Sequence, residues 1–286
     1  MIRPLICLAV TALPLLSAPA MAQDRIPSHC ISLAQAPGLE VIHRAAFGDP
    51  LGKDRVRISF LHHAMFAIET PGGLTAVTDY TGFTGSSDHV PTVVTMNNSH
   101  STHWTPAPDP RIPHVLPGWG TADYPTEHDL DLGEMRVRNV HTDARGGWEG
   151  GIRKNGNSIF VFETAGLCIG HLGHLHHEPD EAQYAALGRL DVVMVPVDGG
   201  YTMNVESMMK VIARLKSSVV LPMHWFSGHS LAIFLDGMKD SFDIVELEQN
   251  SIELGLHDLP RRPTIMVLPP ELLRGSEPPV RRPASP

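Results

Sequence analysis

Histidine is concentrated in this sequence just after segments that are rich in β-branched and aromatic residues. The chain has 17 histidines, and four separate segments carry them at such positions. These are NSHSTH (98–103) after 92–96, His141 after 135–140, HLGH (171–174) after LCIG, and His224 after VVLPM. A rigid sheet holds the loops that follow its strands in register, so side chains from several loops can meet at one edge. Several strands are therefore expected to end at the same edge of a sheet, where their histidines come together.

The histidine pattern predicts a metal site. Imidazole is the commonest protein ligand for Zn(II), and a tight site needs three or four such groups within about 2.1 Å of the ion. In NSHSTH, residues 98 and 100 can face one way from an extended loop, and residues 100 and 103 can share a face in a turn. Nitrogen ligands suit Zn, Cu or Ni better than Mg, Ca or Mn. Zinc is the expected ion, and Cu, Ni and Fe stay open.

The order of the predicted elements indicates an α/β fold. Strands are expected first and helices alternate with strands only after Gly173, an order that favours a four-layer αβ/βα sandwich over a doubly wound fold. The segment 105–120 is expected to be irregular. The expected strands are 56–60, 64–69, 74–79, 92–96, 135–140, 159–163, 191–197 and 219–223, and the expected helices are 180–187, 204–215 and 231–238.

The first 22 residues have the pattern of a secretory signal. Arg3 precedes an apolar run from Leu5 to Leu16, and Ala20-Met21-Ala22 forms a small-residue cleavage site. An uncleaved signal anchor is the alternative. We therefore expect export to the periplasm or the medium. The expected parts of the chain are a signal peptide (1–22), a lead-in segment (23–54), one domain (55–268) and a Pro-rich disordered tail (269–286).

Charge and cysteine content narrow the partners and the compartment. Loss of Arg3 with the signal would lower the formal net charge from −9 to −10, and no basic run is long enough to follow phosphates. No later segment is apolar over the length of a membrane span. A small-molecule substrate is therefore expected, without nucleic acid or membrane as partner. Cys30 and Cys168 permit one disulfide, and a buried free thiol at Cys168 is equally consistent with the sequence.

Several motifs together resemble the metallo-β-lactamase superfamily over residues 55–268. The resemblance is greatest to the branch of broad metal-dependent hydrolases that are similar to ascorbate-phosphate lactonases. The matching segments are FLHHAMFAIET (60–70), the strand ending at Asp79, NSHSTH for the signature HxHxDH, His141, HLGHLHH (171–177), DVVMVPVDGGYTM (191–203) and LPMHW (221–225).

The resemblance implies roles for individual residues, and it also shows departures from the family pattern. Asn98 replaces the first signature histidine, Thr102 replaces the signature aspartate, and His174 replaces the aspartate that bridges two metals. His63 matches the opening histidine at the rim. The implied metal ligands are His100, His103, His141, His174 and His224, with Asn98 beside them, and the implied catalytic residues are His174, Asp79 and His63.

The altered ligand set favours one bound ion over two. Two dications repel each other, and neutral Thr102 and His174 supply no charge to offset that repulsion. The resemblance implies an exported hydrolase that attacks a small ester, lactone or related substrate with a metal-bound hydroxide. A non-catalytic metal- or ligand-binding protein is the alternative, because both signature carboxylates are absent. A mononuclear iron oxidoreductase is disfavoured for the same reason.

Overall fold

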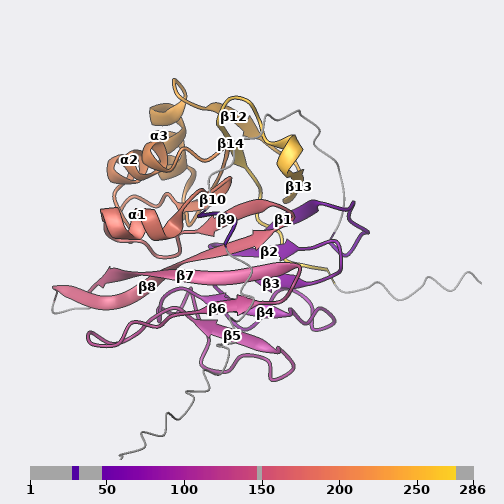
Figure 1. The fold of residues 1–286 in the computed structure, drawn as a ribbon. Helices are drawn as coiled ribbons and strands as arrows, with labels where there is room; N and C mark the ends of the chain where they lie inside the picture. Colours follow the sequence, from indigo (N-terminus) through magenta and orange to yellow (C-terminus); the bar gives the residue numbers. More distant parts are fainter. Residues whose placement is uncertain (1–27, 32–46, 147–149, 275–286) are drawn as a thin grey trace, which may run out of the picture.

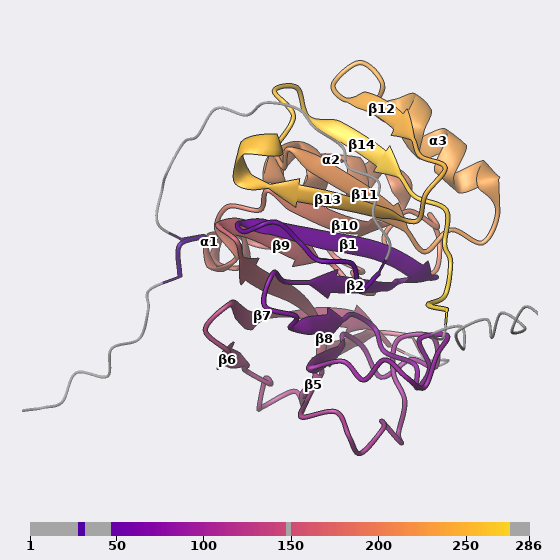
Figure 2. The same cartoon turned by 90° about the vertical axis from the view of Figure 1, so that its right-hand side faces the viewer.

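Two β-sheets pack face to face in the computed structural model, which describes residues 28–31, 47–146 and 150–274. Three helices cover the outer face of the larger sheet (Figures 1 and 2). The expected signal peptide lies outside the described residues. None of the described helices has the length and apolarity that crossing a membrane requires.

The smaller sheet has six strands in the order β13-β1-β2-β3-β4-β5. Strands β3, β4 and β5 are parallel to one another, and the other neighbours are antiparallel. The bounds are β1 Arg55–His62, β2 Met65–Glu69, β3 Thr75–Val77, β4 Val93–Met96, β5 His114–Pro117 and β13 Ser251–Gly255.

The larger sheet has eight strands in the order β12-β14-β11-β10-β9-β8-β7-β6. The five strands from β12 to β9 are mutually parallel, and β8, β7 and β6 continue the sheet in antiparallel pairs. The bounds are β6 Asp129–Asp131, β7 Met135–Arg145, β8 Ile152–Thr164, β9 Leu167–His171, β10 Val192–Pro196, β11 Val219–Met223, β12 Asp243–Glu246 and β14 Thr264–Val267.

Alternation along the strands supplies two hydrophobic layers. In β10, Val192 and Met194 face the smaller sheet, and Val193 and Val195 face the helices, as the two-residue period of a strand requires. Both faces of this strand are buried, so its sequence reads as a continuous apolar run. The outer face of the smaller sheet is covered in the described residues by loops, with Ile112 and Leu273 among the contacts.

Two of the three α-helices begin and end where their sequence signals predict. In α1 (Glu181–Leu187), Asp180 and Gln183 form a capping box, and Asn204 caps α2 (Val205–Leu215). The expected apolar stripe of α2 packs on the sheet, and α3 (Gly228–Met238) begins three residues earlier than expected. The short helix η1 (Leu256–Asp258) follows β13.

Some segments differ from the expectation. Strand β5 lies inside the segment 105–120 that was expected to be irregular, because it pairs with β4. Strands β7 and β8 extend well beyond 135–140 and 159–163, because their polar residues complete a long antiparallel ladder. The expected disordered tail is ordered from Pro269 to Arg274: Leu273 is buried, and its N–H donates to Thr84 O at 2.9 Å. The rest of that tail lies outside the described residues.

A disulfide joins Cys30 to Cys168 in β9, with a Cα–Cα distance of 5.8 Å. Of the two states that the sequence left open, the structure has the disulfide. The short segment around Cys30 is also held by hydrogen bonds. Arg189 N donates to Cys30 O at 2.8 Å, and Ser28 Oγ donates to Glu163 Oε1 at 2.6 Å. Residues 28–31 are thereby fixed to one end of β9.

A buried arginine joins β1 to its neighbours. Arg57 is fully buried, and its guanidinium lies 2.5 Å from Glu253 Oε1 in β13 and 3.3 Å from Glu69 Oε2 in β2. It also donates to Asp49 O at 3.1 Å. Burial raises the pKa of Glu69, although the Arg57 charge acts in the opposite direction. Loss of the cation would leave two carboxylates without their partner in a desolvated position.

We expect Arg57→Met to lower the free energy of unfolding by about 3–5 kcal/mol, the usual loss when one partner of a buried ion pair is removed. Urea unfolding measures the change. The control is Arg262→Met, because the Arg262–Asp243 pair is about half exposed on both sides and should contribute less than about 1 kcal/mol. Equal losses in the two variants would contradict a structural role for Arg57.

Candidate metal centre

The candidate site lies where strands of both sheets end. Asp79 follows β3 and His103 follows β4 in the smaller sheet, whereas His174 follows β9 and His224 follows β11 in the larger sheet. His63 lies in the turn between β1 and β2. The expected convergence of several loops at one edge is therefore present.

His103 stands at the centre of the cluster and is fully buried. Its Nδ1 lies 2.5 Å from Asp79 Oδ2, and its Nε2 lies 3.1 Å from His224 Nε2. The other oxygen of Asp79 accepts a hydrogen bond from Asn97 N at 2.9 Å. Asp79 thus fixes the ring of His103 and makes Nε2 the nitrogen available to a ligand or ion.

His224 has a matching carboxylate on its other side. Its Nδ1 lies 3.2 Å from Asp198 Oδ1, so its Nε2 also points into the cluster. Burial alone would raise the pKa of Asp198, but contacts with His224, the Thr202 hydroxyl and Gly200 N hold it below its usual range. Two buried carboxylate–histidine pairs therefore face each other through their Nε2 atoms.

The backbone around the cluster adopts an unusual conformation. His63, Asp79 and His224 have φ values of 50°, 43° and 60°, in the left-handed region that non-glycine residues seldom adopt. His224 N donates to His63 O at 2.8 Å, so two of these residues hold each other in place. Such conformations collect at functional sites, where surrounding contacts maintain them.

Two groups of nitrogen donors can hold a metal ion. His63, His103 and His224 form one group and His100, His103 and His174 form the other, and within each the ligand atoms lie within 4.8 Å of one another. The buried His63 Nε2 and His174 Nδ1 have no hydrogen-bond partner within the protein. A buried polar atom without a partner is costly. An ion bound by either group would give a buried nitrogen of this kind a partner, so these residues fit a metal.

Three histidines of the cluster, His63, His103 and His174, are held neutral. Burial, followed by repulsion from His224 and His103, lowers the pKa of His63 to about 3. Burial and neighbouring imidazoles also hold the pKa values of His103 and His174 well below the usual range. Burial raises the pKa of Asp79 to about 6. Neutral imidazole is the form that binds metals, so the cluster is preorganised as a ligand set near neutral pH.

Five of the six predicted metal-site positions lie in or beside this cluster. His100, His103, His174 and His224 enter the donor groups, and His63 joins them as a fifth donor beyond the predicted ligands. His141 enters neither group, because the extension of β7 places it inside a strand, on the less buried face. Asn98 is beside the cluster, as predicted, but its side chain has another partner.

That partner is Arg153 of β8. Its Nη2 donates to Asn98 Oδ1 and to Gly156 O, the latter at 2.9 Å, and its Nη1 donates to Ser99 Oγ at 2.5 Å. The amide oxygen of Asn98 is therefore engaged by a cation, which leaves it unsuited to bind a second one. Burial, His224 and the Arg153 charge lower the pKa of His100. Nothing in the sequence around Arg153 marked it as a neighbour of the site.

The remaining histidines near β9 have different surroundings. His171 is buried, and its Nε2 lies 2.8 Å from Ala64 O in the turn between β1 and β2. The ring of His176 lies 4.6 Å from that of His174, centroid to centroid, and burial together with Arg145 lowers its pKa to about 4. His177 is exposed. None of these three histidines enters the two donor groups.

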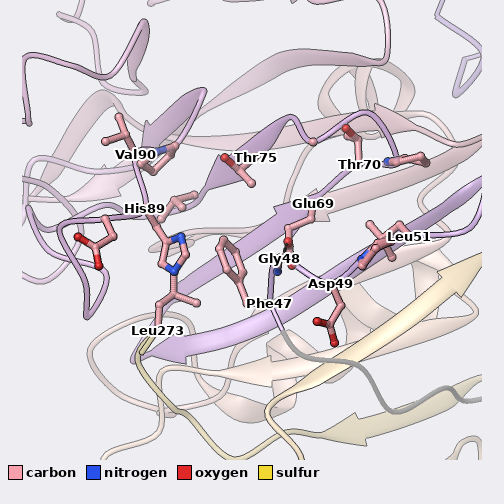
Figure 3. Close-up of a pocket in the computed structure, with 16 residues that line it drawn as sticks. Phe47, Gly48, Asp49, Leu51, Glu69, Thr70, Thr75, His89, Val90 and Leu273 are labelled. Atoms are coloured by element: carbon pink, nitrogen blue, oxygen red, sulfur yellow. Dashed lines mark hydrogen bonds between the residues drawn. The ribbon is translucent and has the colours of Figure 1, made fainter. Parts of the chain in front are cut away.

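A separate cavity of about 380 Å³ lies at the other end of β2, around Glu69 (Figure 3). Its central polar groups already have partners: Glu69 Oε1 accepts from Gly48 N at 2.8 Å, and His89 packs on Phe47 with ring centroids 4.9 Å apart. None of the candidate ligands lines this cavity. The histidine cluster is therefore the candidate site.

Comparison with known proteins agrees with the fold. A family model described as the beta-lactamase superfamily domain matches residues 57–224, which is more than half of the chain. A crystal structure from Thermotoga maritima, assigned to the Zn-dependent hydrolases of the metallo-beta-lactamase superfamily, has a TM-score of 0.53 and 26% identity, and the match covers 74% of this chain and 98% of that one.

Curated relatives match over a shorter length. A UPF0173 metal-dependent hydrolase of Thermoplasma acidophilum is 29% identical over 73 residues, which are 26% of this chain and 33% of the relative. One from Pyrococcus abyssi is 33% identical over 69 residues, 24% of this chain and 31% of the relative. The chain thus matches about a third of the length of these relatives.

The two facing sheets, the strand-end histidines and the family match define an α/β protein of the metallo-β-lactamase fold. The chain belongs to the metallo-β-lactamase superfamily, and the fold class expected from the sequence is confirmed.

We expect Asp79→Asn to weaken metal binding about 10–100-fold, the usual effect of removing a carboxylate that orients a histidine ligand. The amide oxygen can still accept from Asn97 N, so the fold should persist, as circular dichroism would show. Zinc titration against a competing chelator measures the affinity. The control is Asp243→Asn, because Asp243 is about half exposed in its pair with Arg262. Equal affinities in the two variants would contradict the orienting role.

Proposed function

We propose that the protein is a metal-dependent hydrolase that acts on a small ester, lactone or related substrate, with zinc as its ion. The observation that carries the proposal is the 3.1 Å approach of His103 Nε2 to His224 Nε2, each ring backed by its own carboxylate. Two nitrogens that bind one ion at about 2.1 Å must lie close together in this way. The names of the relatives, which are metal-dependent hydrolases, support the same activity.

A bound ion would supply Lewis acidity and lower the pKa of a water molecule. The residues of the chain do the remaining work. His103 and His224 would hold the ion, and Asp79 and Asp198 keep their rings in the required orientation and tautomer. The nitrogen-only donor set favours zinc over magnesium, calcium or manganese.

One ion per chain is the stoichiometry that we propose. Both donor groups contain His103, and its Nδ1 faces Asp79, so only Nε2 is free to bind an ion. A ring nitrogen binds one ion at a time, and therefore the two groups cannot both be complete. The Arg153 cation beside Asn98 and His100 further disfavours a second dication on that side.

We expect the purified protein to contain about one equivalent of tightly bound zinc, measured by elemental analysis. His103→Ala removes the donor common to both groups and should abolish tight binding, whereas His257→Ala, at an exposed position in η1, should keep it. Two equivalents in the wild type would refute the single-ion centre.

Hydrolysis of a panel of esters and lactones should require the bound ion and should stop when a chelator is added. Metal binding without any turnover would favour the alternative, a non-catalytic metal-binding protein.

We also propose that the protein is exported to the periplasm or secreted. The sequence pattern of residues 1–22 supports this, and so does the Cys30–Cys168 disulfide, since disulfides persist mainly in oxidising compartments. Mass spectrometry of the protein from its own cells should find a mature N-terminus at or within a few residues of Gln23. Retention of Met1 would contradict the cleavage.

A further inference from the structure

Two exposed aromatic side chains border the histidine cluster. Tyr201 is 68% exposed and Phe226 is 63% exposed, and their rings meet edge to face with centroids 5.1 Å apart. The Phe226 ring lies 5.2 Å from the ring of His63 and 5.3 Å from that of His224. A large apolar surface therefore remains in water directly beside two candidate metal ligands.

This pair differs from other exposed aromatic residues of the chain. In the part that the structure describes, Phe83 and Tyr124 are also exposed, but neither ring contacts a candidate ligand. Isolated apolar residues on a surface are ordinary and need no function. An edge-to-face aromatic pair at the edge of a ligand cluster is the arrangement expected where an apolar group of a ligand binds.

The loop that carries Tyr201 is fixed before any ligand arrives. The Asp198 carboxylate accepts hydrogen bonds from Gly200 N at 2.9 Å and Thr202 N at 3.1 Å, and also from Tyr201 N. Arg145 Nη1 donates to Gly200 O at 2.9 Å. A ligand group that binds to Tyr201 therefore loses little free energy to ordering of the loop.

Phe226 is anchored through the cluster itself. It follows His224 by two residues, and His224 N donates to His63 O at 2.8 Å. The other side of the cluster is polar, because His100 lies there with Thr102 and Arg153. The centre is thus apolar on one side and cationic on the other.

We propose that Tyr201 and Phe226 bind the apolar group of the substrate and set the specificity of the enzyme. The preferred substrates are esters or lactones that carry an aromatic or large aliphatic group next to the scissile bond, rather than small polar ones. This proposal deepens the proposed hydrolase function and rests on it. The Phe226 ring contacts the rings of His63 and His224. An apolar group bound on Phe226 would therefore lie next to the metal ligands, close to the bond that is hydrolysed.

Binding of two hydroxamates to the zinc-loaded protein tests the proposal without turnover. Acetohydroxamate and phenylacetohydroxamate share the metal-binding group and differ in the aromatic ring. Calorimetry of the wild type should give at least about tenfold tighter binding of phenylacetohydroxamate, since removal of an aromatic ring from water is worth that much. In the double variant Tyr201→Ala with Phe226→Ala, the ratio should fall to about two or less. Phe83→Ala is the matched control and should keep the ratio of the wild type.

Equal affinities in the wild type, or a preference that survives in the double variant, would overturn the proposal. If neither hydroxamate binds the zinc-loaded wild type, the bound ion has no position open to a ligand, and the hydrolase function and the specificity proposal both fail. If the aromatic preference is present but no ester or lactone is hydrolysed, the hydrolase function fails while the apolar binding surface stands. Zinc content measured for each variant separates loss of the ion from loss of the ring contact.

Discussion

The contact between Asp79 and His103 is the constraint on which the rest of the site depends. It joins the loop after β3 to the loop after β4 inside the protein, where neither group meets water. Because one nitrogen of His103 is committed to the carboxylate, the other has a fixed direction, and the remaining donors are arranged around it. A buried carboxylate is tolerated there because Asn97 N and His103 satisfy both of its oxygens.

The sequence was sufficient to predict the sandwich and most of the cluster. His103, His174 and His224 follow short apolar strands, and strands of that kind fix where the next residues lie. His141 was misplaced because the polar residues after 140 lack the pattern of a strand. Pairing with β8 nevertheless extends β7 through them, and a long-range contact of this kind leaves no local signal.

Arg153 shows a second limit of prediction from sequence. A lone arginine in a polar strand is ordinary, and only the fold brings it to Asn98, 55 residues away in the chain. The amide at position 98 and the cation at position 153 belong together physically. An amide accepts hydrogen bonds from a guanidinium through its oxygen, which a metal-binding imidazole cannot do as well.

The disulfide determines where a tag or a solid support can be attached to the chain without blocking the site. Cys168 lies near the start of β9, whereas His174 follows the end of the same strand, so about 10 Å of strand lies between Cys168 and the end that leads to His174. The segment around Cys30 is therefore pinned to the side of the sandwich away from the histidines. A tag or solid support attached at that segment would leave the histidine cluster accessible. The protein could therefore be immobilised without blocking access of substrate to the site.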